Sequence, residues 1–356
     1  MFSKIFYNLK AVFVVVLTSL VLITSCSDDD PVTPTNENDF SKIIADYADN
    51  VVVATYEELK SNALQLETAV KTLQSQSTQS NLDAAVELWK STRAPWEMSE
   101  AFLFGPVGFL SLDPSLDSWP LDRAQLNEVL NSSFELTPDF IQEGLGFSLR
   151  GFHTIEYLLF ADGSPRIVSE LTTRELEYLV SVTAVLASDA SVLYDEWEGA
   201  YRDEYVNAGK SGSRYISQEQ AVQEIVEGII VIADEVGNGK ISDPYSTKDV
   251  LTVESWFSWN SLTDFKNNII SIQNAYLSSS QFSSTGIGLD SFVAEKNTVL
   301  DTRIKQEINN AISAIEAIPA PFRNNLNADS QIQAAIDACN VIVNTFENDV
   351  KPLISN

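Results

Sequence analysis

Histidine and cysteine are nearly absent from this 356-residue chain, which contains one histidine and two cysteines. The single histidine, His153, excludes an HExxH metalloprotease helix, a zinc carboxypeptidase site and zinc centres built from several histidines or cysteines. Each of these sites needs more imidazole or thiolate ligands than the chain has. A metal here would be held by one imidazole and several carboxylates, a ligand set that suits iron, manganese or calcium better than structural zinc.

Several other chemical signatures are also missing. The sequence contains no Gly-x-Ser-x-Gly elbow, P-loop or dinucleotide fingerprint. Strand signals are scarce, because the β-branched run Val51–Val53 lies inside a helical pattern from Phe40 to about Leu73. We therefore predict an all-α fold.

Basic residues are few compared with acidic ones. The chain has 22 lysines and arginines against 50 aspartates and glutamates, for a formal net charge of −28. Such a chain repels nucleic acid and anionic lipid headgroups but accepts metal ions and cationic partners. We expect no nucleic-acid partner.

The N-terminus predicts export and lipid anchoring. Lys4 and Lys10 precede the apolar run Ala11–Ile23, which is short for a membrane span. The run ends at Cys26 in a pattern typical of a lipobox. We therefore expect residues 1–25 to be a lipoprotein signal peptide and Cys26 to carry the lipid. A polar, acidic tether follows over residues 26–39. These features predict an outer-membrane lipoprotein that is exposed on the cell surface or, alternatively, faces the periplasm.

Helical periodicity continues to the C-terminus. Ile332, Ile336, Cys339 and Val343 fall on one apolar stripe, so Cys339 is predicted to be a small buried hydrophobe. The glycine- and serine-containing break near residues 209–214 suggests two four-helix-bundle-like domains, over 40–209 and 210–356.

The histidine belongs to the hexapeptide Gly151-Phe-His153-Thr-Ile-Glu156, within a segment predicted to be helical from Phe147 to Phe160. Residues three apart on a helix share a face, so His153 and Glu156 can converge on one ligand. The alternative is a structural histidine that is hydrogen-bonded to a neighbouring carboxylate.

Two further clusters combine charge with tryptophan. In the first, Arg93, Trp96 and Glu100 are spaced to line one helical face, with Glu97 beside them. This pattern can orient an anion or a metal ligand, or it can be a salt bridge at a helix contact.

The second cluster runs from Glu254 to Phe265. Helical spacing would place Glu254, Ser258 and Ser261 on one face, with Asp264 next along. A polar seam between two helical bundles is the alternative interpretation.

Together, these three segments in this order resemble the imelysin family, also called insulin-cleaving membrane proteases. The resemblance covers about Phe40 to Leu353 and rests on the Gly-x-His-x-x-Glu hexapeptide, the Arg93–Pro106 stretch and the Glu254–Asp264 stretch. It implies two helical halves with a site at their interface. The site residues it implies are His153, Glu156, Glu97 and Glu100 for a metal or ligand, with Arg93, Trp96, Ser258 and Asp264 around them.

The resemblance also implies a role in the cell envelope, often in iron uptake. Our first hypothesis is a lipoprotein that binds iron or an iron-bearing ligand, with a divalent metal as the cofactor class. The second is a metallopeptidase that uses His153 and Glu156, with Glu97 or Glu100 as the base. The third is a non-catalytic module that docks onto an outer-membrane partner protein.

Overall fold

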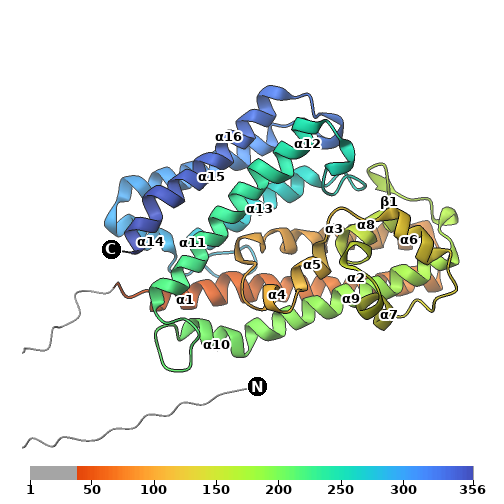
Figure 1. Cartoon of the computed structure of the whole chain (residues 1–356), viewed down its shortest axis with the longest axis horizontal. Helices are drawn as coiled ribbons and strands as arrows, with labels where there is room; N and C mark the ends of the chain where they lie inside the picture. The colour runs from red at the N-terminus through yellow and green to blue at the C-terminus, as the bar shows by residue number, and fades with distance from the viewer. Residues whose placement is uncertain (1–37, 356) are drawn as a thin grey trace, which may run out of the picture. The chain divides into compact units, whose positions relative to one another are not determined.

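The computed structural model describes residues 38–355. The predicted signal peptide, the lipidation site Cys26 and most of the tether lie outside these residues. From Asp39 onward the chain forms one compact unit, and it is helical almost throughout (Figure 1). The all-α prediction is confirmed for the described part of the chain.

The helices are α1 Ser41–Tyr47, α2 Ala54–Ser75, α3 Gln79–Glu97, α4 Pro106–Phe109, α5 Leu112–Asp117, α6 Arg123–Leu130, α7 Pro138–Gly144, α8 Phe152–Leu159, α9 Thr173–Glu198, α10 Ala200–Val206, α11 Gln218–Asp234, α12 Ser242–Thr247, α13 Ser261–Leu277, α14 Leu289–Lys296, α15 Thr298–Glu316, α16 Asp329–Thr345 and α17 Lys351–Ile354. Short 3₁₀ or π-helical segments join several of them. The described strands are β1 Phe160–Ala161 and β2 Ser164–Pro165, a two-residue antiparallel pair.

One group of helices is built on α2, α3 and α9, which pack side by side (Figure 1). Along α2 the buried residues Tyr56, Leu59, Ala63, Leu66, Val70 and Leu73 alternate three and four apart. This spacing makes one apolar face, which the other two helices cover. The helix α9 begins with a capping box, in which the side chains of Thr172 and Glu175 each accept a hydrogen bond from the other residue's backbone amide.

A second group consists of α11, α13, α15 and α16 (Figure 1). The C-terminal stripe lies in its core, and Cys339 is fully buried there as predicted. The groups are in contact, because α3 and the 3₁₀ turn Glu100–Phe102 pack against α13. A domain boundary near residue 209 stays a prediction.

A close approach of two backbones fixes the position of the Glu100–Phe102 turn. A Cβ on Gly228 of α11 would lie 2.0 Å from the carbonyl oxygen of Ala101, so only glycine allows this contact. The hydroxyl of Ser271 on α13 also accepts a hydrogen bond from the Ala101 amide, at 3.1 Å. The turn that carries Glu100 is therefore held by both α11 and α13.

Three helix boundaries differ from the sequence prediction. The helix that carries His153 begins at Phe152 instead of Phe147, because Gly151 adopts φ +77° and ends the preceding turn. The helix that carries Arg93 ends at Glu97, so Glu100 is not on the same helical face. Residues 254–259 form turns, with α13 starting only at Ser261, so the shared helical face predicted for Glu254 and Ser258 is wrong.

Among the described residues, α9 is long and apolar enough to pass a membrane-span test by length and composition. Two-thirds of its apolar window is buried inside the protein. This burial is typical of a core helix of a folded domain.

Candidate metal site

The histidine is buried and held from one side by a carboxylate. His153 and Glu156 lie one turn apart on α8, and His153 Nδ1 is 3.1 Å from Glu156 Oε2. The other oxygen of Glu156 accepts hydrogen bonds from the backbone N–H and the hydroxyl of Ser258, at 2.8 and 2.7 Å. Glu156 therefore orients the imidazole, and the second ring nitrogen, Nε2, faces the opposite way.

Gly151 allows a second segment to reach the histidine. A Cβ at this position would lie 2.2 Å from the carbonyl oxygen of Leu116, near the end of α5. Because glycine has no Cβ, the end of α5 can pack directly on the start of α8. The next residue, Asp117, is thereby brought beside His153.

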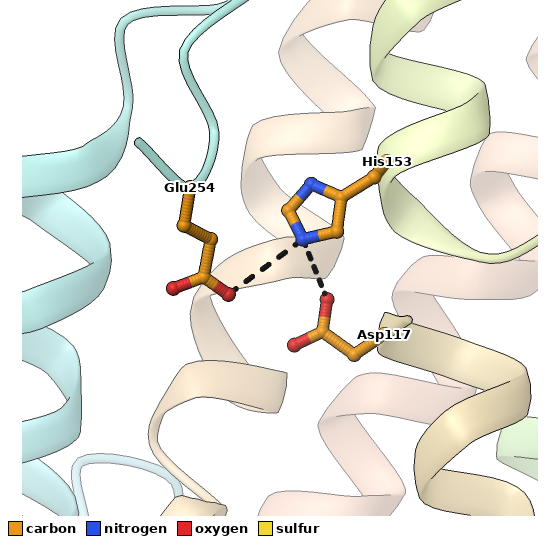
Figure 2. A group of neighbouring side chains, drawn as sticks. All are labelled: Asp117, His153 and Glu254. Atoms are coloured by element: carbon orange, nitrogen blue, oxygen red, sulfur yellow. Dashed lines mark ion pairs between the residues drawn. The ribbon is translucent and has the colours of Figure 1, made fainter. Parts of the chain in front are cut away.

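Three side chains from three parts of the chain converge at this point (Figure 2). His153 Nε2 is 3.2 Å from Asp117 Oδ1 and 3.6 Å from Glu254 Oε1. The ligand atoms of the three residues all lie within 4.8 Å of one another. We call Asp117, His153 and Glu254 the inner group. The indole ring of Trp119 covers the imidazole, with ring centroids 4.7 Å apart.

The guanidinium of Arg93 lies on the far side of the inner group and is completely buried. It contacts Asp117 and reaches Glu254 Oε1 at 2.9 Å. It also pairs with Glu97 Oε1 at 2.5 Å and approaches Asp264 Oδ2 at 3.6 Å. Arg93 thus balances part of the carboxylate charge that would otherwise be uncompensated in the interior.

Further hydrogen bonds fix the orientation of these carboxylates. Trp96 Nε1 donates to Asp117 Oδ2 at 2.7 Å, and Asn268 Nδ2 donates to Glu97 Oε2 at 2.6 Å. Asn260 Nδ2 donates to Asp264 Oδ1 at 2.6 Å. The carboxylate oxygens therefore have defined directions before any ligand is present.

A cleft of about 610 Å³ leads to the inner group. Its lining includes both carboxylates of that group, Asp117 and Glu254, together with Trp119. The other acidic residues in the lining are Glu100, Asp113, Glu235 and Asp243. Lys240 is the basic residue in this lining, so the cleft favours cations.

The buried charges shift one another's pKa values. Burial alone would lower the pKa of His153, but the carboxylates of Asp117, Glu156 and Glu254 raise it well above its usual value. Burial alone would raise the pKa of Glu254, but Lys240, His153 and Arg93 hold it well below the usual range. Burial raises the pKa of Glu97 to about 8. Burial alone would also raise the pKa of Asp117, but Arg93 and His153 lower it, so both carboxylates of the inner group are charged at neutral pH.

The inner group fits a metal ion by the chemistry of its donors. It offers one imidazole nitrogen and two carboxylates, a set that transition metals such as iron and manganese accept. His153 Nε2 is buried and faces only carboxylate oxygens, those of Asp117 at 3.2 Å and Glu254 at 3.6 Å. Its other nitrogen faces a carboxylate, the arrangement that orients metal-binding histidines in proteins.

The structure brings the residues selected from the sequence into one cluster. One side of the cluster consists of His153, Glu156 and Ser258. The other side consists of Arg93, Trp96, Glu97 and Asp264. Glu100 lies further out, where it lines the cleft. Their functional roles stay predictions; Glu156 lies at Nδ1 of the histidine, whereas Asp117 and Glu254 lie at Nε2.

Three important residues were not selected from the sequence. Asp117 is the last residue of the short helix α5, in a stretch of sequence without apolar periodicity. The nearby Trp119 is the feature of the sequence that could have pointed to it. Glu254 was noted in the third segment but not chosen for the site. Lys240 lies in a π-helical segment, Glu235–Ile241, whose two glycines are typical of a loop.

Comparisons with known proteins show relatives in sequence and in fold. The sequence is 31% identical over 322 residues to "Iron-regulated protein A" of Synechococcus elongatus, covering 88% of this chain and 86% of that protein. A crystal structure described as an iron-regulated protein A precursor from Parabacteroides distasonis superposes with a TM-score of 0.82 at 33% identity, over 91% of this chain and 97% of the other. An imelysin-like protein from Psychrobacter arcticum shares the fold, with a TM-score of 0.73 at 12% identity, over 90% and 98% of the two chains.

The fold and the cluster define a helical protein with a buried histidine–carboxylate site at the end of an acidic cleft. The chain belongs to the imelysin family, whose model matches residues 52–346 and whose description names M75 peptidases. It is a homologue of iron-regulated protein A.

Proposed function

We propose that this protein binds an iron or other divalent metal ion at Asp117, His153 and Glu254, as an imelysin-like protein of the cell envelope that serves iron uptake. The observation that carries the proposal is the convergence of three donor atoms within 4.8 Å at the end of the acidic cleft. The similarity to proteins described as iron-regulated supports iron as the ion.

Some residues of the proposed site would bind the metal ion, and others would orient those ligands. Asp117 and Glu254 supply charge, and His153 Nε2 supplies a nitrogen donor that discriminates against calcium and magnesium. Glu156 and Ser258 fix the direction of the imidazole, while Trp96 fixes Asp117. Trp119 covers the histidine and restricts the access of water.

A calorimetric titration of the mature protein in detergent tests this proposal. Fe²⁺ under anaerobic conditions, Mn²⁺, Zn²⁺ and Ca²⁺ are titrated separately into the wild type, His153→Ala and Asp117→Asn. We expect one bound Fe²⁺ or Mn²⁺ per chain, and a loss of affinity of at least about tenfold in each variant, equal to about 1.4 kcal/mol.

Asp122→Asn is the matched control for Asp117→Asn. Asp122 caps α6 through a hydrogen bond to the amide of Gln125, and asparagine caps a helix equally well. The control removes the same charge outside the inner group, so its affinity stays at the wild-type value. Equal affinity in the wild type, His153→Ala and Asp117→Asn would refute the site.

Peptide hydrolysis is a second candidate function, because the family description names peptidases. The specific observation in its favour is Glu100, a buried acid on the cleft wall whose pKa burial raises well above the usual value. A carboxylic acid in this state can exchange protons with a substrate. Metal-dependent cleavage of a peptide library that is lost in both His153→Ala and Glu100→Gln would establish it; no cleavage by the metal-loaded wild type would exclude it.

The cell-envelope location is proposed from the N-terminal sequence. Cys26 would carry a lipid that anchors the metal site at the outer membrane, and the surface and the periplasm are the alternative sides. Labelled palmitate should be incorporated into the wild type and not into Cys26→Ala. A Cys26→Ala protein that stays in the membrane fraction with its label would contradict the anchor.

A further inference from the structure

Lys240 is surrounded by four carboxylates and forms only one long hydrogen bond with them, to Glu254 Oε1 at 3.5 Å. Its side chain is only 9% exposed, although it lines the cleft. Its Nζ is 3.2 Å from Glu254, 3.7 Å from Glu100, and 3.8 Å from both Glu97 and Glu235. We call these four acids the outer group.

The ammonium balances charge in the outer group without filling its hydrogen-bonding capacity. Charge-assisted hydrogen bonds between nitrogen and oxygen measure about 2.7–2.9 Å, shorter than every contact of Lys240 with the outer group. Oε2 of Glu254 is buried, faces this ammonium and accepts no hydrogen bond from any described residue. An acceptor of this kind has capacity for a stronger positive partner.

The carboxylates around Lys240 can also converge on one ion. Oxygens of Glu97 and Glu100, two members of the outer group, and of Asp117 from the inner group all lie within 4.8 Å of one another. Glu97 and Glu100 are 3.8 and 3.7 Å from the ammonium. This set contains oxygen donors only, which suit manganese, magnesium or calcium. Glu100 and Glu254 line the cleft, so an ion could reach them from solvent.

We propose that Lys240 is a tethered cation that occupies the place of a second divalent metal ion in the outer group. Its ammonium limits the protein to one metal ion, at the inner group. The inference rests on the proposed metal site, because Glu254 contacts both His153 and Lys240 and Asp117 belongs to both sets of donor oxygens. Replacement of Lys240 by a neutral residue should therefore add an oxygen-ligated site.

The test counts Mn²⁺ ions bound per chain by the mature protein, through equilibrium dialysis with metal analysis. The wild type should bind one ion and His153→Ala none. Lys240→Gln should bind two, and the double variant Lys240→Gln with His153→Ala should bind one, at the outer group. Lys240→Arg keeps the positive charge and should stay at one ion.

Lys266→Gln is the control for the loss of one positive charge, because Lys266 is a surface residue that pairs with Glu316. It should bind one ion, as the wild type does. Lys240→Met, which keeps the aliphatic stem, replaces Lys240→Gln if circular dichroism shows that the glutamine variant is not folded.

The result separates this inference from the proposed function. One ion in folded Lys240→Gln, or none in the double variant, would overturn the role of Lys240 while leaving the inner site intact. One ion in the double variant, with none in the wild type, would support the outer site and remove the inner one. Two ions in the wild type would also overturn the inference, because Lys240 would then exclude nothing.

Discussion

At the scale of single residues, the site depends on how one histidine and one arginine are held among carboxylates. His153 has its two ring nitrogens in different surroundings, with Nδ1 facing Glu156 and Nε2 facing Asp117 and Glu254. Glu156, the acidic residue of the Gly-x-His-x-x-Glu motif, thus orients the imidazole. The two carboxylates at Nε2, Asp117 and Glu254, come from distant segments.

This division of roles predicts a graded effect at Glu156. Glu156→Gln keeps the size of the side chain but removes its charge, so the imidazole loses its ionic partner. We expect metal affinity to fall by about 10–100-fold, the usual cost of changing the group behind a metal-binding histidine. His153→Ala should abolish binding under the same titration. A Glu156→Gln variant with unchanged affinity would contradict the orienting role.

Arg93 is expected to contribute to the stability of the fold. Arg93→Met leaves Glu97, Asp117, Glu254 and Asp264 buried around an apolar side chain. Removal of one partner from a buried ionic cluster costs about 3–5 kcal/mol of unfolding free energy, measured by urea denaturation. The control Arg303→Met loses ion pairs with Asp349 and Glu307 near the surface, each of which is worth about 0–1 kcal/mol. Similar losses in the two variants would contradict this account.

At the scale of elements, apolar periodicity in the sequence predicted the long helices. It did not predict the helix ends and turns that depend on tertiary packing. The helical pattern of α2 and the apolar stripe of α16 could be predicted, because each depends on neighbours within a few residues. The turn structure of residues 254–259 was not readable. It includes φ angles of +51° at Ser255 and +62° at Trp259, in a segment whose spacing also matched a helix.

The end of α3 shows the same limit. Pro95 cannot donate a hydrogen bond to the Ser91 carbonyl, which instead accepts one from the side chain of Asn62 on α2, at 3.1 Å. The helix continues to Glu97 and then stops, which moves Glu100 onto the turn held by α11. The position of Glu100 depends on packing against α11, so residue spacing within the segment could not predict it.

The contact between α5 and α8 gives an element-scale prediction. Gly151→Ala introduces both strain at φ +77° and a Cβ that would lie 2.2 Å from backbone at Leu116. Gly212→Ala is a matched control, because Gly212 has φ +97° but open space around its Cβ position. We expect about 1–2 kcal/mol of destabilisation for the control, from backbone strain alone. Gly151→Ala should cost more and should also weaken metal binding, because Asp117 is displaced. Equal unfolding free energies would show that the close approach is unimportant.

At the scale of the whole molecule, the inner group joins residues 117, 153 and 254, which lie in widely separated parts of the sequence. Glu254 comes from the segment before α13, whereas Asp117 and His153 come from α5 and α8. A metal ion bound by all three would therefore stabilise the folded chain as a unit. The convergence also explains why no local motif revealed the complete set.

This linkage predicts a metal-dependent unfolding temperature. If only the folded chain binds the ion, a concentration 100 times the dissociation constant stabilises the fold by about 2.7 kcal/mol. Thermal unfolding followed by circular dichroism should shift upward with added Fe²⁺ or Mn²⁺ and return when a chelator is added. The shift should be absent in His153→Ala. An equal shift in that variant would place the binding elsewhere.

The central claim is that Asp117, His153 and Glu254 hold one metal ion. The most direct measurement is anomalous diffraction from crystals of the protein grown with Mn²⁺, with data collected on both sides of the manganese absorption edge. The account predicts one anomalous peak at bonding distance from His153 Nε2 and from carboxylate oxygens of Asp117 and Glu254. A fully occupied peak away from His153, or none at a saturating manganese concentration, would contradict it.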